Sequence, residues 1–453
     1  MKFLGVNIGK LINISCKITG KGGTSLPGKI ALKYDSKLIE KLIGPIKNNK
    51  VIITGTNGKT TTSGLIASIL TTAGKSVVHN KEGANMKAGI ATALIKSSDF
   101  LGNLQKDATV FEVDEANMPI VIEDVKPNIV VITNFFRDQL DRYGELDTTV
   151  EKVKKALLNL PQDSIVLLNA DEPFTASIGD EIKSKVFYYG IEDNIEGINS
   201  SSFEQKYCPI CAHKYEYKKI YYGQLGDYYC PNCGKKRPNP HFKATNIFLN
   251  EDGINFNIYY KDKIFTVKSR LIGLYNVYNL LAAISAGILL NIDFSTILKA
   301  IESYWPIEGR LQKTKIKSKK TIINLIKNPI GFESTLNMLS QFNKPLNLLI
   351  SINDNYADGR DVSWLWDVNL ESFLSKTKVN YIVTSGLRAE DMAVRLKYAG
   401  FDIKKIKIIN SIEKALDTIA DLTEEELIAV LPNYTSLYGV SKYLKLQEAK
   451  KWN

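Results

Sequence analysis

The stretch "VIITGTNGKTTTSGLI", residues 51–66, decides the fold: a β-rich run leads into a glycine-rich turn and then a helical run. Backbone N–H groups of such a turn at a helix start bind anions through unpaired amides and the helix dipole. Lys59 can reach a terminal phosphate, and the Thr60 hydroxyl can bind Mg²⁺. The turn is shorter than the usual nucleotide loop, in which four residues separate the first glycine from Gly-Lys-Thr; Ile53 holds that first position here. We therefore predict a compact nucleotide loop, the alternative being a glycine turn before an ordinary capped helix.

The chain has 453 residues, 44% of them hydrophobic and 24% charged, which is typical of a soluble protein with two or three domains. No apolar run is long enough to span a bilayer. The N-terminus faintly resembles a signal peptide, but Lys10 interrupts it and no cleavage site follows, so we expect a cytoplasmic protein. The net charge of +11 is concentrated in the first 50 residues. Such a charge is expected for a solvated basic face, and also for a surface that binds nucleic acid or an anionic membrane. Charge alone does not decide among these three.

Short β-rich runs alternate with helical stretches from residue 50 onward, which predicts an α/β fold with a parallel, doubly wound sheet. We divide the chain into a basic N-terminal segment (1–48), a central domain (49–311) and a C-terminal α/β domain (312–453). Residues 203–245 interrupt the alternation and are expected to form an insertion. In such sheets the functional residues gather beyond the carboxyl ends of the strands.

The insertion carries four cysteines in the pattern C-x2-C-x18-C-x2-C: Cys208, Cys211, Cys230 and Cys233. Four thiolates in two such pairs fit tetrahedral Zn²⁺ and leave no open position for catalysis. We predict a structural zinc ribbon. A zinc ribbon can contact nucleic acid or simply hold an insertion together.

Carboxylates for Mg²⁺ are offered by "FEVDEAN", where Glu112, Asp114 and Glu115 follow a strand. Strand alternation puts Glu112 and Asp114 on the same side, so it does not select between them. The alternative is a solvated acidic turn.

In their order along residues 50–330, these motifs resemble the Mur ligases and folylpolyglutamate synthetases. The match rests on the compact loop at 55–61, "EVDE", the segment 133–144, "LLNADEP" with Asn169 and Asp171, "GLYNVYN" and "EGR". The resemblance implies a Mur ligase-type central domain, a Rossmann-like C-terminal domain, and ATP-dependent phosphorylation of a carboxylate followed by attack of an amine. It implies that Thr60 and Glu112 hold Mg²⁺. The implied ATP-binding residues are Thr56, Asn57, Gly58, Lys59, Thr60, Thr61, Asn169, Asn279 and Arg310.

The sequence departs from the family pattern at three positions: Gln139 and Tyr275 each replace a family histidine, and Asn324 replaces an aspartate. A glutamine is a poorer metal ligand than a histidine, so the sequence does not decide whether a second Mg²⁺ site is present. The nucleotide loop begins near residue 50, so the usual domain for a nucleotide-sugar is not expected before it.

The zinc ribbon together with "DNYADGRD", residues 354–361, and "LPNYTS" resembles the MurT branch of the family, the synthetase subunits of lipid II isoglutaminyl synthase. The resemblance implies amidation of the D-isoglutamate α-carboxyl of the lipid II stem peptide at the membrane surface. Ammonia would come from a GatD-like glutaminase partner. In this branch an aspartate of the loop completes the partner's Cys–His triad; Asp361 is our candidate and Asp358 the alternative.

The remaining cysteine and the histidines support this division of labour. Cys16 has no histidine near it in sequence, and His79, His213 and His241 show no triad-like arrangement. We therefore expect a separate polypeptide to release ammonia from glutamine. Two other functions stay open: a ligase that adds an amino acid to a carboxylate, and a zinc-ribbon protein that binds nucleic acid.

Overall fold

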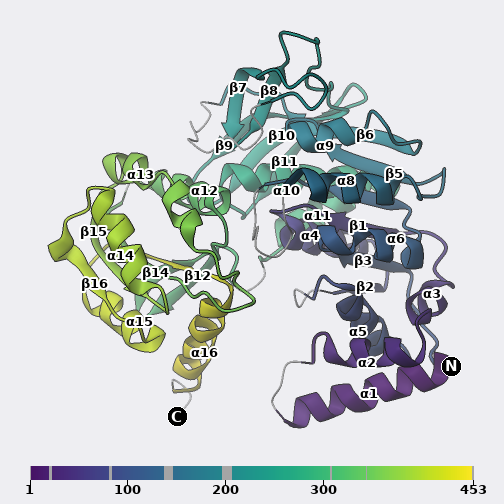
Figure 1. Ribbon diagram of the computed structural model, residues 1–453, viewed down its shortest axis with the longest axis horizontal. Helices are drawn as coiled ribbons and strands as arrows, with labels where there is room; N and C mark the ends of the chain where they lie inside the picture. Colours follow the sequence, from purple (N-terminus) through teal and green to yellow (C-terminus); the bar gives the residue numbers. More distant parts are fainter. Residues whose placement is uncertain are drawn as a thin grey trace.

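The computed structural model describes residues 2–19, 23–80, 84–136, 146–195, 207–306, 309–342 and 344–450. The described chain contains two large sheets, each covered by helices on both faces (Figure 1). Gln139 and the rest of the segment 137–144 lie outside the described residues. No helix in the described ranges combines the length and apolar character needed to cross a bilayer.

The first sheet has nine strands in the order β11-β10-β9-β6-β5-β4-β1-β3-β2. The parallel strands are β1 (Lys50–Thr54), β2 (Val77–His79), β3 (Ala108–Glu112), β4 (Ile129–Ile132), β5 (Ile165–Asn169) and β6 (Lys185–Ile191). The other strands are β9 (Phe242–Leu249), β10 (Ile254–Tyr260) and β11 (Lys263–Ser269). β9 pairs parallel to β6, but β10 pairs antiparallel with both β9 and β11. The prediction of a parallel sheet is thus confirmed for β1 to β6 and β9 and wrong at the edge, where β10 runs antiparallel to its neighbours and the sheet becomes mixed.

Each face of this sheet has its own hydrophobic core, because successive strand residues point to opposite sides. Val51 and Ile53 of β1 join one core, and Ile52 joins the other. The first core is covered by α4 (Lys59–Thr72), α10 (Leu274–Leu289) and α11 (Phe294–Ser303). The second is covered by α5 (Lys87–Ser97), α6 (Met118–Val125) and α8 (Leu146–Leu157).

The basic N-terminal segment folds into three helices that extend the second core. They are α1 (Lys2–Ile18), α2 (Leu26–Tyr34) and α3 (Leu38–Ile43). α2 and α3 pack on α5, and α1 packs on α2 (Figure 1). Apolar side chains such as Val6, Leu38 and Leu42 are fully buried there, which ties this segment firmly to the central sheet.

The four-cysteine insertion carries a two-stranded hairpin, β7 (Glu216–Tyr222) and β8 (Leu225–Tyr229). The tip of the hairpin is buried in the central domain rather than exposed. Gln224 Nε2 donates to the Glu172 carboxylate at 2.8 Å and to the Phe135 carbonyl at 2.9 Å. Glu172 also caps the short helix α9 (Pro173–Ile178). The insertion therefore reaches the strand ends of the first sheet.

The second sheet has six strands in the order β12-β13-β17-β14-β15-β16, all parallel except the β12–β13 pair. Its strands are β12 (Gln312–Ile316), β13 (Lys319–Ile323), β14 (Leu346–Ser351), β15 (Val379–Ser385), β16 (Ile406–Ile408) and β17 (Leu427–Pro432). One face is covered by α12 (Pro329–Ser340), α13 (Leu370–Lys376) and α14 (Ala389–Tyr398). The other is covered by α15 (Ile412–Asp421) and α16 (Tyr434–Lys450).

Candidate functional site

The glycine-rich loop between β1 and α4 is held tightly by the residues that follow β4. The Thr56 backbone N–H donates to the Asn134 carbonyl at 2.8 Å, and the Asn57 N–H donates to Asn134 Oδ1 at 2.9 Å. Gly55 and Gly58 have φ values of +119° and +86°, which favour glycine. The loop therefore has a fixed backbone with its N–H groups at the start of α4, as an anion site requires.

Gly58 is also fixed by its neighbour on α10. A Cβ atom at this position would lie only 2.2 Å from Asn279 Oδ1. The Thr62 hydroxyl donates to the same oxygen at 3.4 Å, while Asn279 Nδ2 donates to Asn276 Oδ1 at 2.8 Å. Asn279, predicted to lie near the nucleotide, thus touches the loop directly.

The Lys59 ammonium folds back on its own loop. Its Nζ donates to the Gly55 carbonyl and to the Thr56 carbonyl, the latter at 3.3 Å, and pairs with the Glu115 carboxylate at 3.2 Å. Burial acts to raise the pKa of Glu115, but the positive charges of Lys59 and Lys327 outweigh it, so this pKa is lowered. Glu115 is therefore a carboxylate that holds the loop lysine in place.

The Thr60 hydroxyl lies 2.8 Å from Glu112 Oε2. Asp114 instead accepts a hydrogen bond from the Ala116 N–H at 3.1 Å and caps the short 3₁₀ helix Glu115–Asn117. Strand alternation did not select between Glu112 and Asp114 as the Mg²⁺ ligand. The geometry favours Glu112, because it lies beside Thr60. A hydroxyl and a carboxylate side by side form the oxygen-rich corner that Mg²⁺ prefers next to phosphate.

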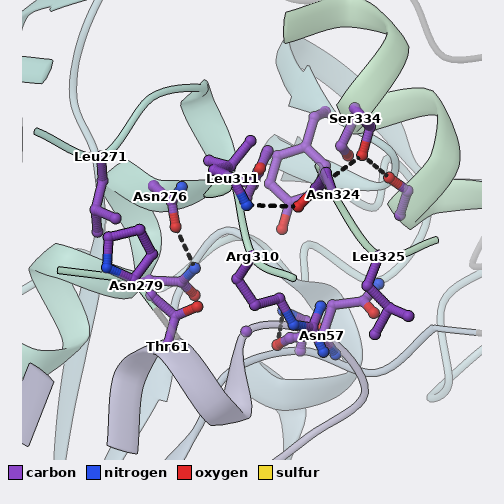
Figure 2. A pocket seen from close by; sticks show the side chains of 17 residues that line it. Asn57, Thr61, Leu271, Asn276, Asn279, Arg310, Leu311, Asn324, Leu325 and Ser334 are labelled. Carbon is purple, nitrogen blue, oxygen red and sulfur yellow. Dashed lines mark hydrogen bonds between the residues drawn. The ribbon is translucent and has the colours of Figure 1, made fainter. Parts of the chain in front are cut away.

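A pocket of about 650 Å³, including its open mouth, lies between the two sheets beside this loop (Figure 2). Asn57, Gly58 and Thr61 line it from the loop and α4, and Tyr222 lines it from the hairpin of the four-cysteine insertion. The remaining walls come from α10, the connection between the sheets and the C-terminal domain: Tyr275, Asn276, Asn279, Arg310, Leu311, Asn324, Leu325, Ser334 and Thr335. Both domains therefore contribute to one cavity.

Arg310 points into this pocket from the segment that joins the two sheets (Figure 2). Burial lowers its pKa and the charge of Glu112 partly offsets this, but a guanidinium stays protonated near neutral pH. In the described part of the chain no carboxylate lies within ion-pair distance of it. A mostly buried cation facing a cavity is well suited to an anionic ligand.

The loop is joined directly to the C-terminal domain by a pair of amides. Asn328 Nδ2 donates to Asn57 Oδ1 at 3.1 Å, and Asn57 Nδ2 donates to Asn328 Oδ1 at 3.4 Å. Asn328 Oδ1 also accepts the Gly331 N–H at 2.8 Å and caps α12. Asn324, which replaces a family aspartate, is buried and bonds to Thr335 at 2.7 Å.

Several predicted residues do not line the pocket: Thr56, Lys59, Thr60, Glu112, Asn169 and Asp171. Asn169 is fully buried and donates to the Thr133 carbonyl at 3.1 Å, so it supports the strand end next to the loop. Asp171 pairs with Arg237 at 2.6 Å and accepts the Tyr278 hydroxyl at 2.7 Å. Burial raises the pKa of Asp171, although Arg237 acts to lower it. Asp171 thus anchors the chain that leaves the four-cysteine insertion.

The four predicted cysteine ligands converge, with all Sγ atoms within 4.8 Å of one another. The Cys208–Cys233 and Cys211–Cys230 Sγ pairs are 3.5 and 3.4 Å apart. Metal–sulfur bonds of about 2.3 Å in a tetrahedron give sulfur–sulfur distances near 3.8 Å, so the donor set fits. Ala212 and Gly234 occupy the same place after each cysteine pair, with φ of +54° and +74°, and the two turns are built alike.

The two candidate aspartates in the loop after β14 have different surroundings. Asp361 is exposed, and its Oδ1 accepts the Ser363 N–H at 2.8 Å. Asp358 is almost fully buried and accepts the Thr435 N–H and hydroxyl at 2.8 and 2.6 Å. Burial raises the pKa of Asp358, while the bonds from Thr435 act to lower it. Of the two, Asp361 is the exposed residue.

Known proteins match this chain along nearly its whole length. The Mur ligase middle domain model matches residues 53–235 and 231–287, and the MurT ligase C-terminal model matches residues 325–437. The protein named lipid II isoglutaminyl synthase (glutamine-hydrolyzing) subunit MurT of Staphylococcus aureus (strain COL) is 37% identical over 434 residues, covering 95% of each chain. The chain belongs to the MurT family of Mur ligases.

Other relatives agree with this membership. The MurT subunit of Streptococcus pneumoniae (strain ATCC BAA-255 / R6) is 33% identical, covering 96% of this chain and 95% of its own. A pseudomurein peptide ligase type C from Methanothermus fervidus superposes with a TM-score of 0.69 at 25% identity, covering 89% and 79% of the two chains. MurF of Thermotoga maritima, solved with ADP, shares the fold with a TM-score of 0.66 at 14% identity, covering 93% and 85%. The predicted Mur ligase fold and MurT resemblance are confirmed.

Sequence reasoning missed three features of the MurT-family site. Glu115 was named only as one of three possible Mg²⁺ ligands. Its place directly after "EVD" could have suggested that one of these acids pairs with Lys59 instead. Asn328 and Tyr222 reach the loop and pocket from distant parts of the chain. No local pattern signals such long-range contacts.

We expect Gly58→Ala to weaken ATP binding about tenfold or more, because the new Cβ would meet Asn279 and strain the left-handed backbone. The matched control is Gly74→Ala at the other end of α4, where φ is +78° and a Cβ meets nothing within 4 Å. It should lose some stability but keep its ATP affinity, measured by calorimetric titration. Wild-type affinity in Gly58→Ala would contradict this account of the loop.

We expect the purified chain to hold about one zinc ion, measured by elemental mass spectrometry. Cys211→Ser should lose the metal and unfold at a lower temperature, because the hairpin that carries Gln224 into the core loses its anchor. Cys16→Ser, outside the cluster, is the control and should keep the metal. Full zinc content in Cys211→Ser would refute the four-cysteine site.

Proposed function

We propose that this chain is the ATP-dependent synthetase subunit of a lipid II isoglutaminyl synthase. It would convert the D-isoglutamate α-carboxyl of the lipid II stem peptide to the amide of D-isoglutamine. The single observation that carries the proposal is the match to MurT subunits over 95% of the chain. The site supports it, because Asn57, Gly58 and Arg310 line one pocket between two domains, and Lys59 belongs to the same loop.

The proposed reaction has two steps. An oxygen of the α-carboxylate attacks the γ-phosphorus of ATP, and the bond to the bridging oxygen of ADP breaks. Ammonia then attacks the carbonyl carbon of the acyl phosphate; the C–O bond to phosphate breaks, and a proton leaves the nitrogen. The products are ADP, phosphate and the carboxamide, and phosphate is a far better leaving group than the original carboxylate oxygen.

The residues of the loop stabilise the negative charge that moves during phosphoryl transfer. The Lys59 ammonium, now bonded to Glu115, would turn to the terminal phosphate when ATP enters. Arg310 supplies a second cation without a competing carboxylate in the described chain. Thr60 and Glu112 would hold Mg²⁺, which when bound neutralises phosphate charge. The pocket residues Asn57, Thr61 and Asn279 would position the nucleotide, with Thr56 and Asn169 supporting the loop.

Ammonia would come from a GatD-like glutaminase subunit in a heterodimer. Four of the five cysteines converge on the proposed structural zinc site, and Cys16 is buried in α1. The exposed Asp361 carboxylate is suited to orient and charge an imidazole of the partner, which then activates a thiol. The substrate would be lipid II at the inner face of the membrane.

We expect Lys59→Ala to reduce ATP-dependent amidation of lipid II about a hundredfold or more, because the phosphoryl group loses a direct positive charge. Lys315→Ala, an exposed lysine of β12, makes the same change of charge and should keep full activity. The assay follows phosphate release and amidated product with the partner present. Full amidation by Lys59→Ala would rule out the mechanism.

Asp361→Asn should abolish glutamine-dependent amidation but leave amidation with free ammonium largely intact, because only the partner's triad loses its carboxylate. Asp358→Asn is the comparison: it disturbs the buried contacts with Thr435 and should mainly lower the melting temperature. Equal loss of both activities in a folded Asp361→Asn protein would show that the triad assignment is wrong.

A further inference from the structure

Helix α1 is apolar on two opposite faces. One face, formed by Gly5, Val6, Gly9 and Cys16, is buried against the rest of the domain. The other is exposed and consists of Phe3 (57%), Leu4 (51%), Leu11 (64%), Ile14 (48%) and Ile18 (81%). At about 100° per residue, these five positions fall within a single arc of about 100°. Asn7 is the one polar residue in the same arc. An exposed apolar stripe of this kind is typical of a helix that is covered by something else.

The stripe continues onto the chain that follows α5. Asn7 Nδ2 donates to the Phe100 carbonyl at 2.8 Å, and Lys10 Nζ donates to the Ser98 carbonyl at 2.6 Å. The Lys10 ammonium also lies 5.0 Å from the centre of the Phe100 ring. Phe100 and Leu101 are 65% and 68% exposed. Since Asn7 and Lys10 neighbour Phe3 and Ile14 on the helix wheel, Phe100 widens the same apolar surface.

Exposed lysines flank this surface, although the turn at residues 98–101 also carries one exposed carboxylate, Asp99. The first 50 residues hold ten lysines but only two acidic residues, Asp35 and Glu40. Asp35 is buried and paired with Lys41 at 2.7 Å, so it does not offset the charge outside. Lys17 is exposed on α1, and Lys29 and Lys33 are exposed on α2, which packs against it. Figure 1 shows α1 as the outermost layer, with α2 and α5 between it and the central sheet.

We propose that α1 and the turn at residues 98–101 dock the chain on an anionic lipid bilayer, with the apolar stripe in the interface and the lysines at the headgroups. A helix with an apolar face and flanking lysines binds such surfaces by burial and by charge attraction. A second copy of the chain fits less well, because pairing this surface with itself would bring the same lysines together. The biological use rests on the proposed function, in which the substrate is membrane-borne.

The test is flotation of the full chain with vesicles of phosphatidylcholine alone or with about 30% phosphatidylglycerol, without lipid II, ATP or glutamine. The wild type should bind the anionic vesicles, less so at high salt, and bind neutral vesicles weakly. Leu11→Gln/Ile14→Gln should weaken binding about tenfold or more. The matched control is Phe248→Gln/Ile264→Gln, two equally exposed apolar residues on β9 and β11, near the sheet edge opposite β2.

Several outcomes would overturn the proposal. The first is failure of the wild type to bind anionic vesicles, and the second is an equal loss of vesicle binding in the control variant. The third is a wild type that self-associates and becomes a monomer in the Leu11→Gln/Ile14→Gln variant. Loss of partner binding in the α1 variant with unchanged vesicle binding would assign the surface to the glutaminase instead. Circular dichroism and the melting temperature confirm that each variant folds. Vesicle binding needs no ligase activity, so its failure and failure of the proposed function are separate results.

Discussion

The close approach of the Gly58 backbone to the Asn279 carboxamide is the constraint on which the site depends. It brings the start of α4 and the first turns of α10 into contact, with no room for a side chain between them. The same loop is bonded to Asn134 after β4 and to Asn328 at the start of α12. A short loop held from three directions needs few residues of its own to present its N–H groups, which explains how it works without the longer turn of other nucleotide loops.

The electrostatics of the site match a polyphosphate ligand. Lys59 is held by Glu115, whereas Arg310 is mostly buried and faces the pocket. Burial penalises the Arg310 charge, and an anionic ligand would relieve that penalty. Because Asn57, Arg310 and Asn328 come from the loop, the connection and the C-terminal domain, binding of such a ligand would favour one arrangement of the two domains.

The sequence predicted the parts of this structure that depend on local pattern. The strands β1 to β5 end in or are followed by polar residues and alternate with helices, so the strands and the position of the loop could be predicted directly. The cysteine spacing predicted a cluster that the structure brings together. The antiparallel edge was missed, because β10 and β11 are half-exposed strands rich in lysine and asparagine within a stretch expected to continue the parallel pattern. Contacts such as Asn57–Asn328 and Tyr222 at the pocket join residues far apart in sequence, which local patterns do not encode.

The central claim is that the compact loop directs the γ-phosphoryl group of ATP onto a substrate carboxylate. Transfer of an oxygen isotope tests it most directly: lipid II carrying ¹⁸O in the D-isoglutamate α-carboxyl is amidated by the complex, and the released phosphate is analysed by mass spectrometry. The account predicts that one labelled carboxylate oxygen appears in each phosphate, because the C–O bond of the acyl phosphate breaks. Phosphate without label, formed alongside the amide, would contradict it.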